Sequence, residues 1–152
     1  MDSRASASGG SAYSYDSLAD LHRYTFHEEH HFYVVVLNYS QPKVTRNAKD
    51  PFCSTLLVTD ASLMASGHRP VVLNIFSKDM SMLPSIRSVG DVLRIHRAHV
   101  DRYNDSYQLI ANPTSHFRSA LLLAHRRADP SSGLYAATEE SSGGESVKFQ
   151  VS

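Results

Sequence analysis

The sequence predicts an all-β domain, a small barrel of five strands with short helices at its flanks. Three observations support this. Short runs rich in Val, Leu, Ile and aromatic residues recur between residues 31 and 111, separated by turn-forming residues. One run, residues 91–98, alternates between apolar and polar side chains, as a half-buried strand does. The long helical patterns that a parallel sheet needs between its strands are not found.

The first three strands are predicted from composition and turn signals. Residues 31–40, HFYVVVLNYS, combine valines with aromatic residues and predict the first strand. A long loop at 41–51, with two prolines and three basic side chains, leads to the second strand at 52–59. A turn at 61–70 contains glycine, serines and a proline, and a third strand follows at 71–76.

The fourth and fifth strands complete the predicted barrel. The fourth, DVLRIHRA at residues 91–98, follows a short helical turn or coil that ends at a glycine. Its leucine and isoleucine point to one face, so Arg94 and His96 point to the other. Asn104-Asp105 predicts a hairpin turn, and the fifth strand follows at 107–111.

The segments outside the strands suggest a division of the chain. Residues 1–15 are mostly Ser, Ala and Gly, which predicts a disordered tail, and 128–152 predict a second, mostly disordered tail in which VKFQV could form a strand. Residues 16–30 predict a short helical lead-in, capped by the Asp or the Ser at its start. Residues 115–127, SHFRSALLLAHRR, predict a closing helix, so the expected domain covers 31–127.

The connectivity favours one barrel class. Five short strands, no βαβ rhythm and a short connection between the third and fourth strands are typical of a five-stranded Greek-key barrel, the OB-fold. An SH3-like barrel or an open sheet would share much of this pattern, so pattern alone leaves these alternatives open.

Composition excludes several functional classes. The sequence has no run of 18 or more apolar residues for a membrane-spanning helix, and its N-terminus has no apolar core for a secretory signal. Cys53 is the single cysteine, which excludes an intramolecular disulfide and a cysteine-based zinc site and favours a reducing compartment.

Charge gives weak support for a nucleic-acid partner. The formal net charge is zero, but residues 1–30 hold two basic and five acidic side chains, whereas residues 31–117 hold nine basic and six acidic ones. The predicted barrel is therefore mildly basic. Strong non-specific binding to duplex DNA would need a denser basic patch.

One motif suggests a different chemistry. Residues 27–31, HEEHH, contain the HExxH pattern, which in zinc proteases lies on a helix so that both histidines share a face. Here the motif runs straight into the first predicted strand, and no third ligand follows at a recognisable spacing. No nucleophile elbow, P-loop or GxGxxG motif is present either. We therefore expect neither enzymatic activity nor a metal or other cofactor.

Residues 83–108, LPSIRSVGDVLRIHRAHVDRYNDSYQ, resemble the first OB domain of the telomere end-binding and protection-of-telomeres family. The shared features are a Leu-Pro turn, Gly-Asp, an apolar strand with an internal Arg, His-Arg, and then Tyr and Gln at the same spacing. Upstream, residues 32–62 resemble the family's first hairpin, and VVLNIF at 71–76 resembles its third strand. The resemblance covers residues 31–117, with a loop between Tyr39 and Cys53 that is a residue or two longer than in relatives.

The resemblance implies a nuclear protein at chromosome ends that binds G-rich single-stranded telomeric DNA, together with a possible telomere-binding partner subunit. It implies base stacking on Tyr39, Phe76 and Tyr103, although aromatic residues at strand ends also close barrel mouths. Single strands offer base faces and a charged backbone, so a groove needs aromatic and basic side chains together.

The polar residues of the implied groove have two roles. Arg94 would bind a phosphate or a guanine edge, with His96 on the same face; the alternatives are a salt bridge for the Arg and packing for the His. Asp50 and Gln108 would hydrogen-bond base edges. The implied backbone contacts are Lys43, Arg46, Lys49 and Lys78, each of which could equally be a solvated loop charge.

Two other functions remain open from sequence. One is a protein-interaction OB domain without DNA binding, which would be favoured if Tyr39 and Tyr103 were buried in the barrel mouth or if residues 16–30 filled the groove. The other is general binding of RNA or single strands without telomeric preference.

Overall fold

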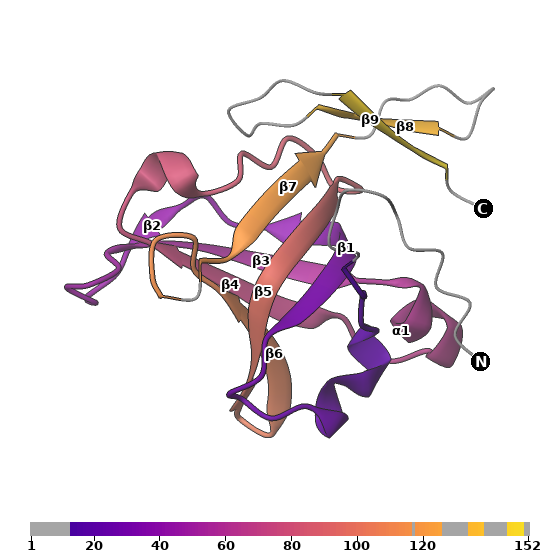
Figure 1. The fold of residues 1–152 in the computed structure, drawn as a ribbon, viewed down its shortest axis with the longest axis horizontal. Helices are drawn as coiled ribbons and strands as arrows, with labels where there is room; N and C mark the ends of the chain where they lie inside the picture. Colours follow the sequence, from indigo (N-terminus) through magenta and orange to yellow (C-terminus); the bar gives the residue numbers. More distant parts are fainter. Residues whose placement is uncertain (1–12, 117, 126–133, 139–145, 151–152) are drawn as a thin grey trace.

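Figure 1 shows the computed structural model, which describes residues 13–116, 118–125, 134–138 and 146–150. Strands dominate it, as the sequence predicts. The strands are β1 (His30–Tyr39), β2 (Lys43–Val44), β3 (Phe52–Thr59), β4 (Val71–Ser77), β5 (Val92–Tyr103), β6 (Ser106–Ala111), β7 (Ala120–Ala124), β8 (Leu134–Thr138) and β9 (Ser146–Gln150). The helices are η1 (Leu18–Arg23), α1 (Ala61–Ser66) and η2 (Met80–Met82).

Five strands close into the predicted barrel. Their order is β1-β3-β4-β6-β5, and β5 pairs again with β1. All of these pairings are antiparallel except β4 with β6, which is parallel. Closure removes the open edges of the sheet, so the open-sheet alternative is excluded and the OB-fold prediction is confirmed.

Alternate residues of every barrel strand form the core. The fully buried side chains include Phe32, Val34, Val36, Leu56, Val58, Leu73, Ile75, Leu93, Ile95 and Leu109. Each contributes roughly 1.5–3 kcal/mol by leaving water. Leu18 and Leu21 of η1 and Leu63 of α1 join this core.

A bulge in β5 decides which of its side chains point outward. Arg97 has φ 61°, a left-handed conformation that is unusual for a residue with a side chain, and the register with β1 shifts beside it. Its N–H donates to His31 Nδ1 at 3.0 Å, and its carbonyl accepts from the Ser119 hydroxyl at 2.6 Å. Before the bulge Ile95 faces the core; after it Ala98 does.

The predicted closing helix is wrong. Residues 120–124 form β7, which pairs with β5 in antiparallel register from Val92↔Ala124 to His96↔Ala120. The apolar run ALLLA fits either state by its pattern, and the free side of β5 before the bulge offers backbone partners that select the strand.

The segment before β1 is helical as predicted, but its cap differs. Ser17 makes no side-chain cap bond; instead Asp60 Oδ2 accepts from Leu18 N–H at 2.9 Å. Asp60 also caps α1 by accepting from Leu63 N–H. The sequence predicted only a turn where α1 forms.

Parts of both predicted tails lie outside the described residues. These parts are 1–12, 128–133, 139–145 and 151–152, and residues 126–127 at the end of the predicted closing helix lie outside as well. The C-terminal tail nevertheless contains β8 and β9, which pair with each other, so disorder is not general there and the strand expected at VKFQV is confirmed as β9. The domain boundaries as a whole stay a prediction. Within the described part of the chain, no helix has the length and apolar character needed to span a membrane.

Candidate nucleic-acid interface

A basic and an aromatic side chain share a row on the outer face of β2, β3 and β4. The register pairs Lys43 with Cys53 and Cys53 with Phe76, and directly paired residues of neighbouring strands share a face. Lys43 is exposed and Phe76 is half-buried. Burial raises the pKa of the Cys53 thiol between them, so this side chain stays neutral.

Next to this row, four polar side chains form a hydrogen-bonded chain across β3, β4, β6 and β5, which we call the polar ladder: Thr55, Asn74, Gln108 and Asp101. The Thr55 hydroxyl donates to Asn74 Oδ1 at 2.8 Å, and Asn74 Nδ2 donates to Gln108 Oε1 at 3.2 Å. Gln108 Nε2 then donates to Asp101 Oδ2 at 3.2 Å. These bonds orient the side chains and leave the amides with further donor and acceptor capacity.

The loop between β1 and β3 carries the predicted loop cations. Arg46 and Lys49 are exposed. Asn47 Oδ1 shapes the loop by accepting from the backbone N–H groups of Lys49 and Asp50. Asp50 Oδ1 is buried and has no hydrogen-bond partner among the described residues, which leaves an acceptor at the base of this loop. Lys78, directly after β4, is exposed as well.

The two predicted stacking tyrosines differ in environment. Tyr39 pairs with Leu56, so it lies on the inner side of β1; it packs against the core and its hydroxyl donates to the Arg87 carbonyl at 3.4 Å. Tyr103 is 65% exposed at the end of β5, beside a turn in which Asn104 and Asp105 both have positive φ. Tyr103 therefore offers an open ring, whereas Tyr39 closes the barrel mouth.

Arg94 and His96 lie on another wall of the barrel. Arg94 pairs with Tyr33 of β1 and Leu122 of β7, and Figure 1 shows β5 and β7 passing in front of β3 and β4. The structure therefore separates Arg94 and His96 from Phe76 and the polar ladder. Their role in DNA binding stays a prediction that rests on the resemblance.

Two N-terminal tyrosines, Tyr13 and Tyr15, cover this second wall; we call them the tyrosine cover. The Tyr13 ring stacks on His96 at 3.9 Å between centroids, and the Tyr15 hydroxyl lies 2.8 Å from His96 Nε2. His96 is only 5% exposed. Burial, helped by the nearby charge of Arg94, lowers the pKa of His96 to about 4, and burial raises the pKa of Tyr15 to about 12.

Sequence reasoning missed three members of the polar ladder: Thr55, Asn74 and Asp101. A signal was present, because Asn74 interrupts an apolar strand at the alternate position that it shares with Phe76. The HEEHH motif begins in a turn and enters β1 at His30, so it has no helix, and no group of three or more metal-ligating side chains occurs among the described residues.

Residues 9–149 match the family model described as telomeric single-stranded DNA binding POT1/CDC13. The chain is 34% identical over 113 residues to the telomere-binding protein 51 kDa subunit of Euplotes crassus, an alignment that covers 73% of this chain and 24% of that protein. It is 37% identical over 94 residues to the telomere-binding protein subunit alpha of Stylonychia mytilus, covering 56% and 18% respectively.

These coverages mean that the chain spans less than a quarter of the length of either relative. A solved structure of fission yeast Pot1 with ssDNA has a TM-score of 0.59 and 19% identity, and covers 72% of this chain and 34% of that one. At this identity the likeness concerns the fold, which agrees with the OB barrel described above.

Proposed function

This chain belongs to the family of telomeric single-stranded DNA-binding proteins described as POT1/CDC13, and from that premise we propose that its barrel binds the G-rich single strand of a telomere. The site is the outer face of β3, β4 and β6, between the loop that follows β1 and the β5–β6 turn. The observation that carries the proposal is the polar ladder beside the row of Lys43 and Phe76.

Each group on this face meets a different part of the strand. Bases stack on Phe76 and Tyr103, a contribution of roughly 1–3 kcal/mol per base. The exposed cations bind the backbone phosphates. For a single strand, each such contact steepens the fall of log K with log salt concentration, the salt slope, by about 0.7. These cations are Lys43, Arg46, Lys49 and Lys78.

Selectivity for guanine comes from the acceptors on this face. The Watson–Crick edge of guanine presents an imino and an amino donor, which a carboxylate or an amide oxygen can accept. The polar ladder holds Asp101 and Gln108 in fixed orientations on this face. Asp50 lies in the neighbouring loop with its Oδ1 buried and unpartnered among the described residues, so it can accept from a base only after the loop exposes it. A prearranged acceptor discriminates against bases that leave it unpaired.

The proposed role is non-catalytic and nuclear. Covering the G-rich strand at the chromosome end would hide it from nucleases and repair enzymes. The relatives named as subunits suggest that a telomere-binding partner subunit completes the assembly.

One observation favours a second candidate, a protein-interaction domain. Tyr39 packs against the core at the barrel mouth, as expected if this tyrosine does not stack on a base. Tyr103 is open, however, which favours DNA. Within the lead-in 16–30, η1 packs against α1, and Phe26, His27 and Glu29 line a pocket beside Asp101 at one end of the polar ladder.

Fluorescence anisotropy with a G-rich telomeric strand tests the proposal, with scrambled and complementary strands as controls, each at low and moderate salt. We expect tight binding to the G-rich strand alone and a loss of affinity in Phe76→Ala. Arg23→Ala is the matched control, because Arg23 is an exposed cation on η1, away from this face. Equal binding of all strands would reduce the function to general single-strand binding, and no binding at low salt would favour the protein-interaction candidate.

A further inference from the structure

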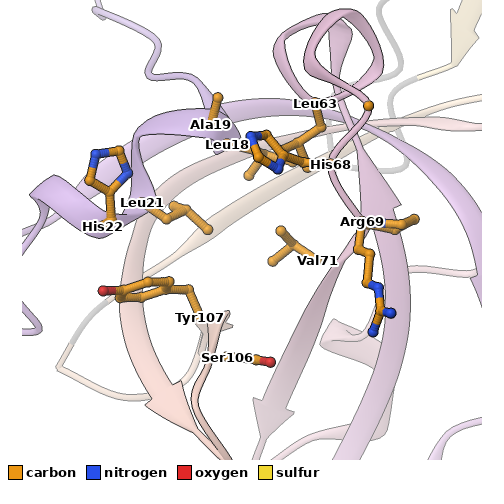
Figure 2. Close-up of a pocket in the computed structure, with 12 residues that line it drawn as sticks. Leu18, Ala19, Leu21, His22, Leu63, His68, Arg69, Val71, Ser106 and Tyr107 are labelled. Atoms are coloured by element: carbon orange, nitrogen blue, oxygen red, sulfur yellow. The ribbon is translucent and has the colours of Figure 1, made fainter.

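A cavity of about 800 Å³ lies at the end of the barrel where β4 and β6 begin, outside the proposed groove. Figure 2 shows side chains from η1, α1 and the two strands arranged around it. We call it the end pocket. The side chains that define its chemistry are Leu21, His22, His68, Arg69, Val71 and Tyr107.

The end pocket has an apolar floor and a basic rim. Leu21 is 2% and Val71 8% exposed, so the floor is part of the core. The Tyr107 ring is 37% exposed and forms one side, with the Arg102 guanidinium 5.9 Å from its centroid. Among the described residues that line the pocket, Arg69, His22 and His68 are basic and none is acidic. This lining suits a ligand that joins an aromatic ring to an anion.

The end pocket adjoins the proposed groove at Ser106, which by alternation shares the outer face of β6 with Gln108 of the polar ladder. Tyr107, between them, points to the side of the buried Leu109, at the end of the barrel. Ser106, which lines the pocket, pairs with the exposed Tyr103 across the turn. A strand that crosses the polar ladder and stacks on Tyr103 therefore arrives at the rim of the pocket.

We propose that the end pocket binds one further nucleotide of the single strand as it leaves the groove, with the base against Tyr107 and the phosphate at Arg69. This rests on the proposed function, because the strand must first occupy the groove. A peptide is the less favoured occupant. Its apolar side chain would use only the floor of the pocket, whereas the basic rim, which has no acidic side chain, suits a phosphate.

The test compares two nested G-rich strands by fluorescence anisotropy, about 6 and about 12 nucleotides long, within the range of roughly 4–16 that OB folds engage. We expect the longer strand to bind the wild type about tenfold more tightly, the order of one additional base stack. Tyr107→Ala should lose this gain and keep the affinity for the short strand, and Tyr107→Phe should restore it. Arg69→Ala should lower the salt slope for the long strand alone, by about 0.7.

Two controls keep the result decisive. Arg23→Ala removes an exposed cation on η1 outside the pocket lining and should change neither affinity. A photoreactive uracil analogue at the end of the long strand should crosslink to Tyr107 in the folded wild-type chain, which guards against a Tyr107→Ala variant that fails to fold.

The outcomes separate this inference from the proposed function. Binding of the short strand with no gain from the longer one overturns the end pocket as a nucleotide site and leaves the proposed function standing. If Tyr107→Ala leaves DNA binding intact and instead weakens capture of a telomere-binding subunit, the pocket belongs to a protein partner and the inference is overturned. Binding of neither strand overturns both.

Discussion

On two walls of the barrel, strand alternation points polar side chains outward. The surroundings of these side chains differ between the two walls. On the outer face of β3, β4 and β6, the polar ladder links its own members and lies beside exposed cations. On the outer face of β1, β5 and β7, the tyrosine cover packs over His96 and leaves it 5% exposed. Alternation decides which side chains point outward, and other segments of the chain decide which of these can reach a ligand.

We expect the two walls to have different roles. Residues of the covered wall should support folding, because their contacts are internal. Residues of the open wall should support binding, because their remaining hydrogen-bonding capacity faces outward. Four expected effects test this division.

The largest expected effect is on folding, at the start of the covered wall. Asp91 is completely buried and accepts from the Arg87 and Ser88 N–H groups and the Ser88 hydroxyl, with His125 Nδ1 at 3.1 Å. Asp91→Ala leaves these donors unpaired and should lower the free energy of unfolding by about 3 kcal/mol. Urea denaturation measures the change.

The control for this substitution is Asp105→Asn, because the Asp105 side chain is 97% exposed and asparagine tolerates the positive φ of this turn position, so the loss should be less than about 0.5 kcal/mol. A similar small loss for both variants would contradict the structural role of Asp91.

The second effect is on binding at the open wall. Phe76→Ala should weaken binding of the G-rich strand by roughly 1–3 kcal/mol, the contribution of one stacked base. Tyr13→Ala, an aromatic truncation in the tyrosine cover, should leave affinity within about threefold. Anisotropy titrations measure both, and a larger loss for Tyr13→Ala would reverse the assignment of the walls.

The third effect is a pH dependence of stability from the covered wall. The pKa of His96 is about 4 in the folded state, below its ordinary value of 6.5, chiefly because it is buried. The unfolded chain therefore binds more protons as pH falls from 6.5 to 4, so stability falls through this window. A pKa difference of one corresponds to about 1.4 kcal/mol, and we expect a loss on that order.

His96→Gln should flatten the dependence of the melting temperature on pH between 6.5 and 4, measured by circular dichroism. Burial also lowers the pKa of His31, so a smaller dependence of the melting temperature on pH should remain in this variant. An unchanged slope would show that the tyrosine cover does not bury His96 in solution.

The smallest effect concerns selectivity. Asn74→Ala breaks the polar ladder in its middle, between Thr55 and Gln108. We expect a loss of about 1 kcal/mol in discrimination between G-rich and scrambled strands, the typical contribution of one hydrogen bond, with little change in binding of the scrambled strand. Competition titrations measure it, and an equal loss for both strands would assign Asn74 to general affinity.

The strands of the barrel can be predicted from the sequence because their signals are local. Val-rich strands and the turn at Asn104-Asp105 follow from neighbouring residues. The errors arise where a distant partner decides: β5 draws residues 120–124 into a strand, and Asp60 caps both η1 and α1. Phe76 and Gln108 reach one face because of strand pairing, which alternation alone does not specify.

Arg94 shows the same limit within the candidate site. The outward direction of its side chain follows from alternation. Which wall of the barrel it lies on depends on the pairing of β5 with β1 and β7 before the bulge at Arg97. A bulge at a residue other than glycine leaves little trace in a single sequence.

The most direct test of the central claim, that DNA binds the open wall, is an NMR titration of the labelled protein with the G-rich strand. We expect the largest shifts at the Asn74 and Gln108 side-chain amides and at the backbone amides of Lys43 and Phe76, with small shifts at Arg94 and His96. The largest shifts at Tyr15, Arg94 and His96, with the polar ladder unchanged, would contradict it.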